Sequence, residues 1–376
     1  LIDQFETNLE LKTDGQAKLL ISLLRFYERE SKPKICTYLR RNKKTDEQLF
    51  DDDTVLYDLS LQSQQETEGK ISCVAKFKSG QPLRKDKIST AIIKGTSVNV
   101  SKISITESSS EPNYNVVSFL INADQKEALQ QVPLILFGEE APIKTDALEN
   151  RLCDITEAYF HTRQLPKLLE TIVNHANPRF NSHISPLPIS RHHYPDNDEY
   201  LSAIISAVKA MDETCLCIQG PPGAGKTYTA EKVITHLIKQ GCRIGIMSNS
   251  HAAIMNLLEP VAKSSPDIPM AKVDGFKTQA LFEEKFPAEQ YPQLAYRGSM
   301  GFTKKQPYES FQVIGATVYA FSKEIAYETP LDYLFVDEAS QVALANLLVV
   351  SGAAKNIILM GDQMQLEQPI QGSHPG

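Results

Sequence analysis

The feature that most constrains the fold of this chain is a glycine-rich loop between an apolar strand and a helix. The residues "CLCIQ" (215–219) predict a buried strand, and "GPPGAGKT" (220–227) matches the pattern Gly-x-x-x-x-Gly-Lys-[Ser/Thr]. An amphipathic helix pattern follows and ends at Gly241. This strand-loop-helix order is typical of a phosphate-binding loop, which predicts a P-loop α/β domain with a parallel sheet.

The residue types in this loop suit the phosphate chain of a nucleotide. Glycines let successive backbone N–H groups point at a β-phosphate, and the helix N-terminus adds partial positive charge. We expect Lys226 to neutralise β- and γ-phosphate oxygens and the Thr227 hydroxyl to ligate Mg²⁺. The residues predicted to bind ATP in this loop are Gly220, Pro221, Pro222, Gly223, Ala224, Gly225, Lys226, Thr227 and Tyr228.

Two carboxylates follow a second apolar strand. The stretch "LDYLFVDEAS" (331–340) delivers Asp337 and Glu338 at the strand's C-terminal edge. By itself an Asp-Glu pair is usually a helix cap. Downstream of a P-loop we interpret Asp337 as a Mg²⁺ ligand, acting through water, and Glu338 as the general base for hydrolysis.

Three more apolar runs end in small or polar residues, as strands of the same sheet would. They are "RIGIMSNS" (243–250), "FQVIGAT" (311–317) and "NIILMGD" (356–362). Ligands bind at the carboxyl ends of the strands in open parallel sheets, so these endings are expected to share one rim. Asp362 and Gln365, in the turn "GDQMQ", are then predicted to lie on the nucleotide side.

The first half of the chain predicts helices around a small β-barrel. Residues 14–43 have helical periodicity, with Asp14 as the expected N-cap and Pro33 expected to kink or interrupt the helix. Short β-type runs with turn signals follow, at 54–61, 70–77, 88–105, 114–121 and 132–137. Residues 145–176 are helical again, and two such helices would form a stalk.

The expected organisation has five parts. They are a first stalk region (1–50), the barrel (51–140), a second stalk helix (141–176), a Pro- and Ser-rich linker (177–198) and a RecA-like ATPase domain (199–376).

The barrel region is rich in basic residues. Between Gly69 and Lys102 a single acid, Asp86, faces eight basic residues: Lys70, Lys76, Lys78, Arg84, Lys85, Lys87, Lys94 and Lys102. The bias suits a surface that follows a phosphate backbone, or equally a solvated barrel face whose lysines protect sheet edges.

Composition limits the class of protein. The net charge is −7, so contact with nucleic acid must be local and not spread over a basic surface. No apolar run approaches the roughly 18 residues of a membrane-spanning helix. The six cysteines form no Cys-x-x-Cys pair, which favours reduced thiols and a cytoplasmic location, and Cys215 and Cys217 are expected to be buried packing residues.

Three motifs in order resemble one family. "GPPGAGKT", "VDEASQ" and "GDQMQLEQP" look like superfamily 1 helicases, in particular the branch with the nonsense-mediated-decay helicase and senataxin. "SNSHAAIMNLL" (248–258) resembles that family's motif Ia and "GATVYA" (315–320) its motif Ic. The stretches "FYERESKPK" and "QLEQPIQGSHPG" resemble bacterial members in which the motor follows a RecB-like nuclease domain, which implies a nuclease upstream.

The resemblance also implies roles for individual residues. Gln341 and Gln365 would sense the γ-phosphate and couple it to the nucleic-acid groove, which adds Gln365 to Lys226, Asp337 and Glu338 as catalytic candidates. The residues that would contact a single strand, with DNA favoured over RNA, are Ser248, Asn249, Ser250, His251 and Thr317; the alternative for these loop residues is plain helix capping.

One part of the family pattern is missing. The family has an Asn and a Gln upstream of the P-loop that read adenine, and "YPDNDEYLSAIISAV" has no clear Leu-Asn-x-x-Gln. Asn197 and Tyr200 are the candidates that remain. ATP is still expected, because no Asn-Lys-x-Asp guanine reader follows the loop.

The chain is expected to bind Mg-ATP but to hydrolyse it slowly. A family motor closes between two RecA-like domains, and nothing after Gln365 can hold the second, whose arginine fingers contribute about 10³- to 10⁵-fold in rate. Two alternatives to a helicase or translocase stay open. One is an ATP-dependent nucleic-acid clamp without unwinding, and the other is an AAA+-type protein remodeller.

Overall fold

The structure of the protein is a computed structural model. It describes residues 1–49, 52–67, 69–81, 91–96, 98–108, 111–131, 133–137, 145–276, 278–298, 301–302, 307–365, 370 and 372–374. The chain divides into two compact units, one made of residues 1–27 and 145–376 and the other of residues 28–144. The boundaries of the five parts expected from the sequence stay predictions.

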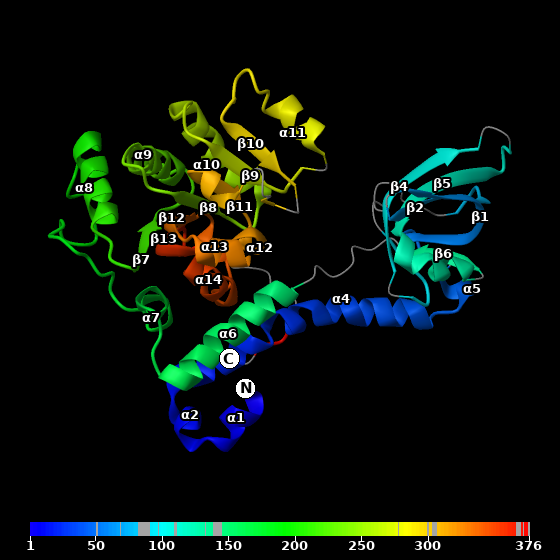
Figure 1. The fold of residues 1–376 in the computed structure, drawn as a ribbon, viewed down its shortest axis with the longest axis horizontal. Helices are drawn as coiled ribbons and strands as arrows, with labels where there is room; N and C mark the ends of the chain where they lie inside the picture. Colours follow the sequence, from blue (N-terminus) through cyan, green and yellow to red (C-terminus); the bar gives the residue numbers. More distant parts are fainter. Residues whose placement is uncertain are drawn as a thin grey trace. The chain divides into compact units, whose positions relative to one another are not determined.

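The first unit is built on a seven-stranded parallel sheet (Figure 1). Its strands lie in the order β10-β9-β11-β8-β12-β13-β7, so the strand before the P-loop is at an edge. The strands are β7 (Cys215–Gln219), β8 (Ile244–Met247), β9 (Met270–Val273), β10 (Leu294–Arg297), β11 (Val313–Ala316), β12 (Leu331–Val336) and β13 (Ala354–Gly361).

Helices cover both faces of this sheet, which is why its strands are continuous apolar runs. Along β12, Leu334 and Val336 belong to one buried cluster and Tyr333 and Phe335 to the other. The first face packs against α7 (Lys167–Val173), α12 (Val318–Phe321), α13 (Glu324–Glu328) and α14 (Leu344–Val350). The second packs against α8 (Asn197–Lys209), α9 (Lys226–Lys239), α10 (His251–Ser264) and α11 (Gln279–Lys285).

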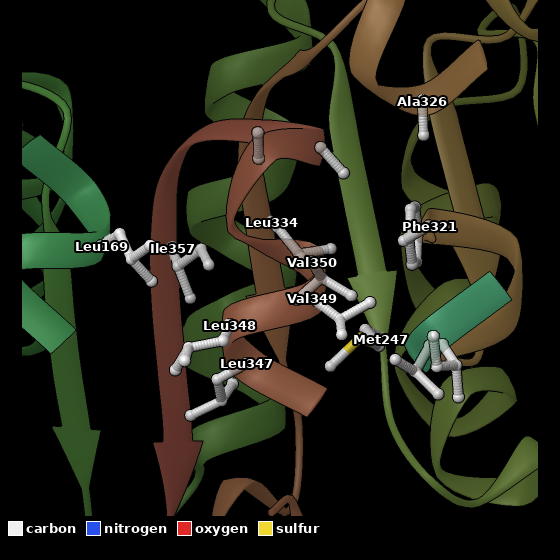
Figure 2. Close-up of a cluster of buried hydrophobic side chains, with 14 of the residues drawn as sticks. Leu169, Met247, Phe321, Ala326, Leu334, Leu347, Leu348, Val349, Val350 and Ile357 are labelled. Atoms are coloured by element: carbon white, nitrogen blue, oxygen red, sulfur yellow. The ribbon is translucent and has the colours of Figure 1, made fainter. Parts of the chain in front are cut away.

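The cluster on the first face holds α14 onto the sheet. Figure 2 shows Leu347 to Val350 of α14 pointing among Met247, Leu334 and Ile357 of three strands. Leu348 has no exposed surface, and truncation of such a leucine to alanine typically costs about 2–5 kcal/mol. Because α14 directly follows the loop with Asp337 and Glu338, this packing also fixes the position of that loop.

Helices from both chain segments of the first unit pack side by side. These are α1 (Ile2–Thr7), α2 (Leu9–Thr13), α3 (Gly15–Leu24) and α6 (Asp146–Thr162). Asp14 caps α3 as predicted, since its side chain accepts from the N–H groups of Gln16 and Ala17. The hydroxyl of Tyr159 in α6 donates to the other Asp14 oxygen at 2.6 Å and so ties α6 to the start of α3.

The predicted interruption at Pro33 is wrong, and the kink, which was the other alternative, stays a prediction. Helix α4 runs from Phe26 to Lys43 with Pro33 inside it, and the interruption between α3 and α4 falls at Arg25. A proline removes one helical N–H donor. In a helix as long as α4 the remaining backbone hydrogen bonds outweigh this loss. Tyr27, in the first turn of α4, donates through its hydroxyl to Asn346 of α14 at 2.7 Å.

The second unit contains a closed antiparallel barrel with strand order β1-β2-β5-β4-β3-β6. The elements are α5 (Asp46–Leu49), β1 (Val55–Thr67), β2 (Lys70–Lys78), β3 (Ala91–Ile93), β4 (Asn99–Glu107), β5 (Tyr114–Asn122), the 3₁₀ helix η2 (Ala123–Gln130) and β6 (Leu134–Phe137). Alternate residues of β2, from Ile71 to Phe77, fill its core. The predicted fold class, a parallel α/β domain preceded by helices and a small β-barrel, is therefore confirmed.

The basic residues of the barrel are only partly engaged within it. Lys76 pairs with Glu111 at 2.9 Å and lies over the ring of Tyr114, and Lys94 donates to the carbonyl of Lys44. Lys70, Lys78 and Lys102 are exposed, whereas Arg84, Lys85, Asp86 and Lys87 lie outside the described residues. The phosphate-following surface stays a prediction.

None of the helices in the described part of the chain combines the length and apolar character that crossing a bilayer would require.

Candidate functional site

The P-loop leaves β7 at its C-terminal end and wraps over the start of α9. Gly223 and Gly225 have φ of +77° and +80°, which only glycine adopts without strain, and the N–H of Thr229 donates back to the Gly225 carbonyl. The Lys226 ammonium donates to the carbonyls of Gly220 and Pro221, at 2.5 and 3.0 Å. Anionic phosphate oxygens are stronger acceptors than these carbonyls, so a nucleotide would compete for Lys226.

Three loops meet beside Gly220. Its N–H donates to the carbonyl of Gly361 at 3.2 Å, which joins the P-loop to the end of β13. Gly361 in turn lies against the loop after Glu338, because a Cβ at this position would be 3.3 Å from the Ser340 nitrogen and 3.4 Å from that of Ala339. The glycine before Asp362 is thus required for a close backbone approach between two of the predicted site loops.

Asp337 and Glu338 follow β12, at the same carboxyl-terminal rim of the sheet as the P-loop. Asp337 is buried, its N–H donates to the Met247 carbonyl, and one carboxylate oxygen accepts from the Glu338 N–H at 3.0 Å. Burial raises the pKa of Asp337 above its ordinary value and the Glu338 carboxylate adds to this, while the Glu338 N–H and Lys226 act in the opposite direction. Glu338 has φ of +53°, a strained backbone for a non-glycine residue that is typical of functional positions.

Gln341 closes the loop after the two carboxylates. Its N–H donates to the Glu338 carbonyl at 2.8 Å, within a 3₁₀ turn (Ala339–Gln341). The Asn249 carboxamide donates to the carbonyl of Gln341. The structure thus brings together a residue predicted to sense the γ-phosphate and one predicted to contact nucleic acid.

The turn after β13 is held by Asp362. This residue is buried, its carboxylate accepts from the Met364 N–H at 2.9 Å, and its carbonyl accepts from the Gln365 N–H at 3.1 Å. Gln365 itself is exposed. Asp362 therefore has a local structural role, and Gln365 has a side chain free to reach a ligand.

The residues after β8 and β11 differ in accessibility. Ser248 has no exposed surface and its hydroxyl accepts from the Ser250 N–H, so direct contact with a nucleic acid from this side chain is not available. Ser250 caps α10 by accepting from the Ala253 N–H, which is the capping alternative. Thr317 precedes α12 without a side-chain cap, and His251 is half-buried.

A large cavity of about 1050 Å³ runs from the P-loop along the edge strand β7. Its walls include Lys226 and Tyr200, together with residues 187–191 of the expected linker. The same expected linker is joined to the end of α8 further upstream, where Phe180 pairs with Met211 in an isolated bridge. The cavity leads from the phosphate loop toward the two candidates for the nucleotide base.

Arg191 is a cavity residue that the sequence did not indicate. Its guanidinium lies over the Tyr200 ring at 4.2 Å and donates to the Asn197 side chain at 2.8 Å. The structure therefore places Asn197 and Tyr200 together, at the first and second turns of α8. The available signal was only the basic stretch "RHHY" before the helix.

The expectation that both cysteines of β7 are buried is wrong for Cys217. Cys215 is buried, but Cys217 is exposed in the cavity wall. A strand at the edge of a sheet is covered on fewer sides than an interior strand, and the apolar pattern does not reveal which position a strand takes. A hydrogen bond with the Cys215 thiol lowers the pKa of Cys217, while partial desolvation acts in the opposite direction.

The donors near the P-loop suit a magnesium ion. Thr227 is half-buried at the start of α9, and Asp337 is a buried carboxylate whose pKa is raised mainly by burial, so a nearby cation would favour its ionised form. Hydroxyl and carboxylate oxygens are ligands that Mg²⁺ accepts, with water and phosphate oxygens completing its shell. These two residues therefore fit the ion that the sequence predicts.

Comparison with known proteins gives one family match and several distant relatives. Residues 204–370, from α8 through the turn after β13, match the family model described as "AAA domain". The "DNA replication ATP-dependent helicase/nuclease DNA2" of Bos taurus is 24% identical over 240 residues, which is 61% of this chain and 22% of that protein. The "Putative ATP-dependent RNA helicase ECM32" of Saccharomyces cerevisiae is 22% identical over 191 residues, 42% of this chain and 17% of that protein. The "DNA-binding protein SMUBP-2" of Rattus norvegicus is 28% identical over 108 residues, 29% of this chain and 10% of that protein.

These matches support a superfamily 1 helicase family. The matched region of this chain contains the P-loop, Asp337 with Glu338, and the Gly-Asp-x-x-Gln turn. The chain spans about a fifth of the length of the Bos taurus relative. These matches do not distinguish between the branches of superfamily 1.

Proposed function

We propose that this chain carries the ATP-binding motor domain of a nucleic-acid helicase or translocase, in which the state of ATP controls the grip on a single strand. The observation that carries the proposal is the meeting of three loops at the P-loop together with the hydrogen bond from Asn249 to Gln341. Through this bond a change at the γ-phosphate can be passed to the residues after β8.

We propose the following division of roles. Lys226 and the backbone N–H groups of the P-loop bind the phosphates. Thr227 and Asp337 hold Mg²⁺, which neutralises charge on the phosphates when bound. Glu338 takes the proton of the attacking water, and Gln365 orients that water or the γ-phosphate.

We propose that the adenine base of ATP lies in the cavity beside Tyr200. The ring of Tyr200 can stack on a base once the guanidinium of Arg191 moves aside, and the amide of Asn197 can bond a base edge. Tyr200→Ala should weaken ATP binding more than it weakens binding of inorganic triphosphate. Equal losses for the two ligands would remove Tyr200 from the base site.

We propose single-stranded DNA as the favoured substrate, contacted through Asn249, Ser250, His251 and Thr317. The word "DNA" in the names of two of the relatives supports this choice, whereas the RNA helicase of yeast supports the alternative. The name "helicase/nuclease" supports a nuclease elsewhere in the same polypeptide. We also propose that the chain belongs to a bacterial form of the branch that contains the nonsense-mediated-decay helicase and senataxin.

The test compares oligonucleotide binding in two nucleotide states. Fluorescence anisotropy of a labelled single-stranded oligothymidylate is measured with the chain, with and without a nonhydrolysable ATP analogue and Mg²⁺. The proposal expects a change in affinity of at least about 5-fold between the states, and about the same affinity in both for Lys226→Met. Binding that ignores the nucleotide would contradict an ATP-controlled grip. In the full-length protein, strand displacement separates a helicase from a clamp that does not unwind.

A further inference from the structure

A buried lysine joins the C-terminal end of β9 to the start of α10, the helix that follows β8. Lys272, near the C-terminal end of β9, has no exposed surface. Its Nζ lies 3.0 Å from Nδ1 of His251, the first residue of α10. The contact spans two strands that are not neighbours, because β11 lies between β8 and β9 in the sheet.

The hydrogen bonds of Lys272 determine which nitrogen of His251 carries the proton. The ammonium also donates to the carbonyls of Val273 and Asp274, both at 2.7 Å. An ammonium has three N–H donors and no acceptor, so its third donor meets Nδ1 and that nitrogen must accept. A neutral imidazole that accepts at Nδ1 carries its proton on Nε2.

The charges around His251 favour the neutral ring. Burial and the Lys272 ammonium lower the pKa of His251 below its ordinary value, and the carboxylate of Asp274 acts in the opposite direction. Because the cation lies next to Nδ1, protonation of that nitrogen would place two positive charges in contact. At neutral pH the ring therefore offers an N–H donor without a charge.

Gly275 holds the ring from a second side. Its φ is +95°, and a Cβ at this position would lie 2.5 Å from Cγ of His251 and 2.6 Å from Nδ1. No side chain fits there without moving the imidazole. The loop after β9 thus fixes the ring by a hydrogen bond from Lys272 and by close backbone contact at Gly275.

We propose that Lys272 is a positioning residue that keeps His251 in the neutral Nε2–H form, so that the ring presents one fixed donor to a phosphate of bound single-stranded nucleic acid. The ligand part of this inference rests on the proposed function, whereas the tautomer does not. Because the donor is uncharged, it orients the backbone and adds little to the salt dependence of binding.

The tautomer is read by nitrogen NMR of the chain labelled with ¹⁵N-histidine, with His251→Gln used to assign the signal. At neutral pH the wild type should show a protonated Nε2 and an unprotonated Nδ1. In Lys272→Met the ring should lose this preference and its pKa should rise toward the ordinary value. A protonated Nδ1 in the wild type, or an unchanged ring in the variant, would overturn the inference.

Binding to a labelled oligothymidylate tests the consequence. Lys272→Met should weaken binding about 5-fold, which is about 1 kcal/mol, without changing its salt dependence. Gly275→Ala should give a similar loss although Lys272 is intact. The matched control is Lys263→Met, which removes the same charge from an exposed lysine paired with Glu259 in α10. A change in salt dependence, or the same loss in the control, would mean that Lys272 acts only by its charge.

A double variant separates positioning from other effects. Lys272→Met should cause no further loss in a His251→Ala background, and a full additional loss would contradict action through the ring. If the wild type bound no oligonucleotide, the proposed function and the ligand part of this inference would fall together. The NMR result would still decide the tautomer, so the two failures are distinguishable.

Discussion

Replacement of Lys272 by methionine should change how the stability of this protein depends on pH. The side chain has no exposed surface, and burial lowers the pKa of its ammonium to about 8 from the ordinary 10.5. Methionine has a similar length and no charge, so it can occupy the same space in the sheet. It leaves the carbonyls of Val273 and Asp274 without this donor, a cost that does not vary with pH.

The sign and size follow from proton binding. Between pH 8 and 10.5 the unfolded chain keeps the Lys272 proton while the folded chain has released it, so the free energy of unfolding increases with pH. For these pKa values the increase is about 2 kcal/mol between about pH 7.5 and pH 9.5. Below about pH 7 both states are almost fully protonated and the pH dependence disappears. Above about pH 10, buried tyrosines with raised pKa values, such as Tyr159 at about 12, reduce stability as unfolded phenols ionise.

The assay is urea unfolding of the wild type and of Lys272→Met across pH 7.5 to 9.5. The difference between their free energies of unfolding should move by about 2 kcal/mol in favour of the wild type as pH rises. Lys263→Met, at an exposed position, should parallel the wild type. Parallel curves for the wild type and Lys272→Met would refute a desolvated ammonium at this position.

Three further predictions concern the loops around the P-loop. Glu338→Gln in the full-length protein should keep ATP binding but lower turnover by at least about 10²-fold, and retained turnover in a phosphate-release assay would exclude Glu338 as the base. Asn249→Ala removes the donor to Gln341, so ATP affinity should stay within about 2-fold while the ATP analogue no longer alters oligonucleotide affinity; an undiminished response in anisotropy would exclude this bond as the link. Gly361→Ala should lower the free energy of unfolding by about 1–3 kcal/mol, because its Cβ meets backbone of the loop after Glu338. Gly298→Ala adds a Cβ that has no atom of the described residues within 4 Å, so it should be nearly neutral in urea unfolding. Equal effects of the two alanines would contradict the close approach.

Five of the seven sheet strands and the barrel were predictable because their signals are local, whereas the short strands β9 and β10 were not predicted. Continuous apolar runs such as that of β12 need cover on both faces, and the alternation along β2 needs cover on one. The P-loop was predictable for the same reason, since its glycines and Lys226 are set by a contiguous pattern.

Features that depend on contacts distant in the chain were not predictable. Nothing in the pattern of β7 indicates that it is the edge strand, so the exposure of Cys217 was missed. Lys272 lies in a short apolar run, where a lysine suggests an exposed position, and its burial depends on acceptors that only the folded loop supplies. The contact of Arg191 with Tyr200 joins a segment without regular structure to a helix, and such packing has no periodic signature.

In the candidate site, too, the motif residues were predictable and the long-range contacts were not. The sequence singled out Asp337, Glu338 and Gln365 by motif, but it could not indicate that Gly361 lies against the loop after Glu338. It also offered Ser248 as a nucleic-acid contact, because position in a motif does not reveal that a side chain is buried. Burial separates these residues, and burial is a property of the whole fold.

The most direct test of a P-loop ATP site at this sheet edge is equilibrium binding of a fluorescent ATP analogue to the chain, with and without Mg²⁺. We expect saturable, magnesium-dependent binding to the wild type that falls at least about 10-fold in Lys226→Met, because the ammonium that meets the β- and γ-phosphates is gone. Binding of equal strength in the two proteins, or no binding to the wild type, would contradict this expectation.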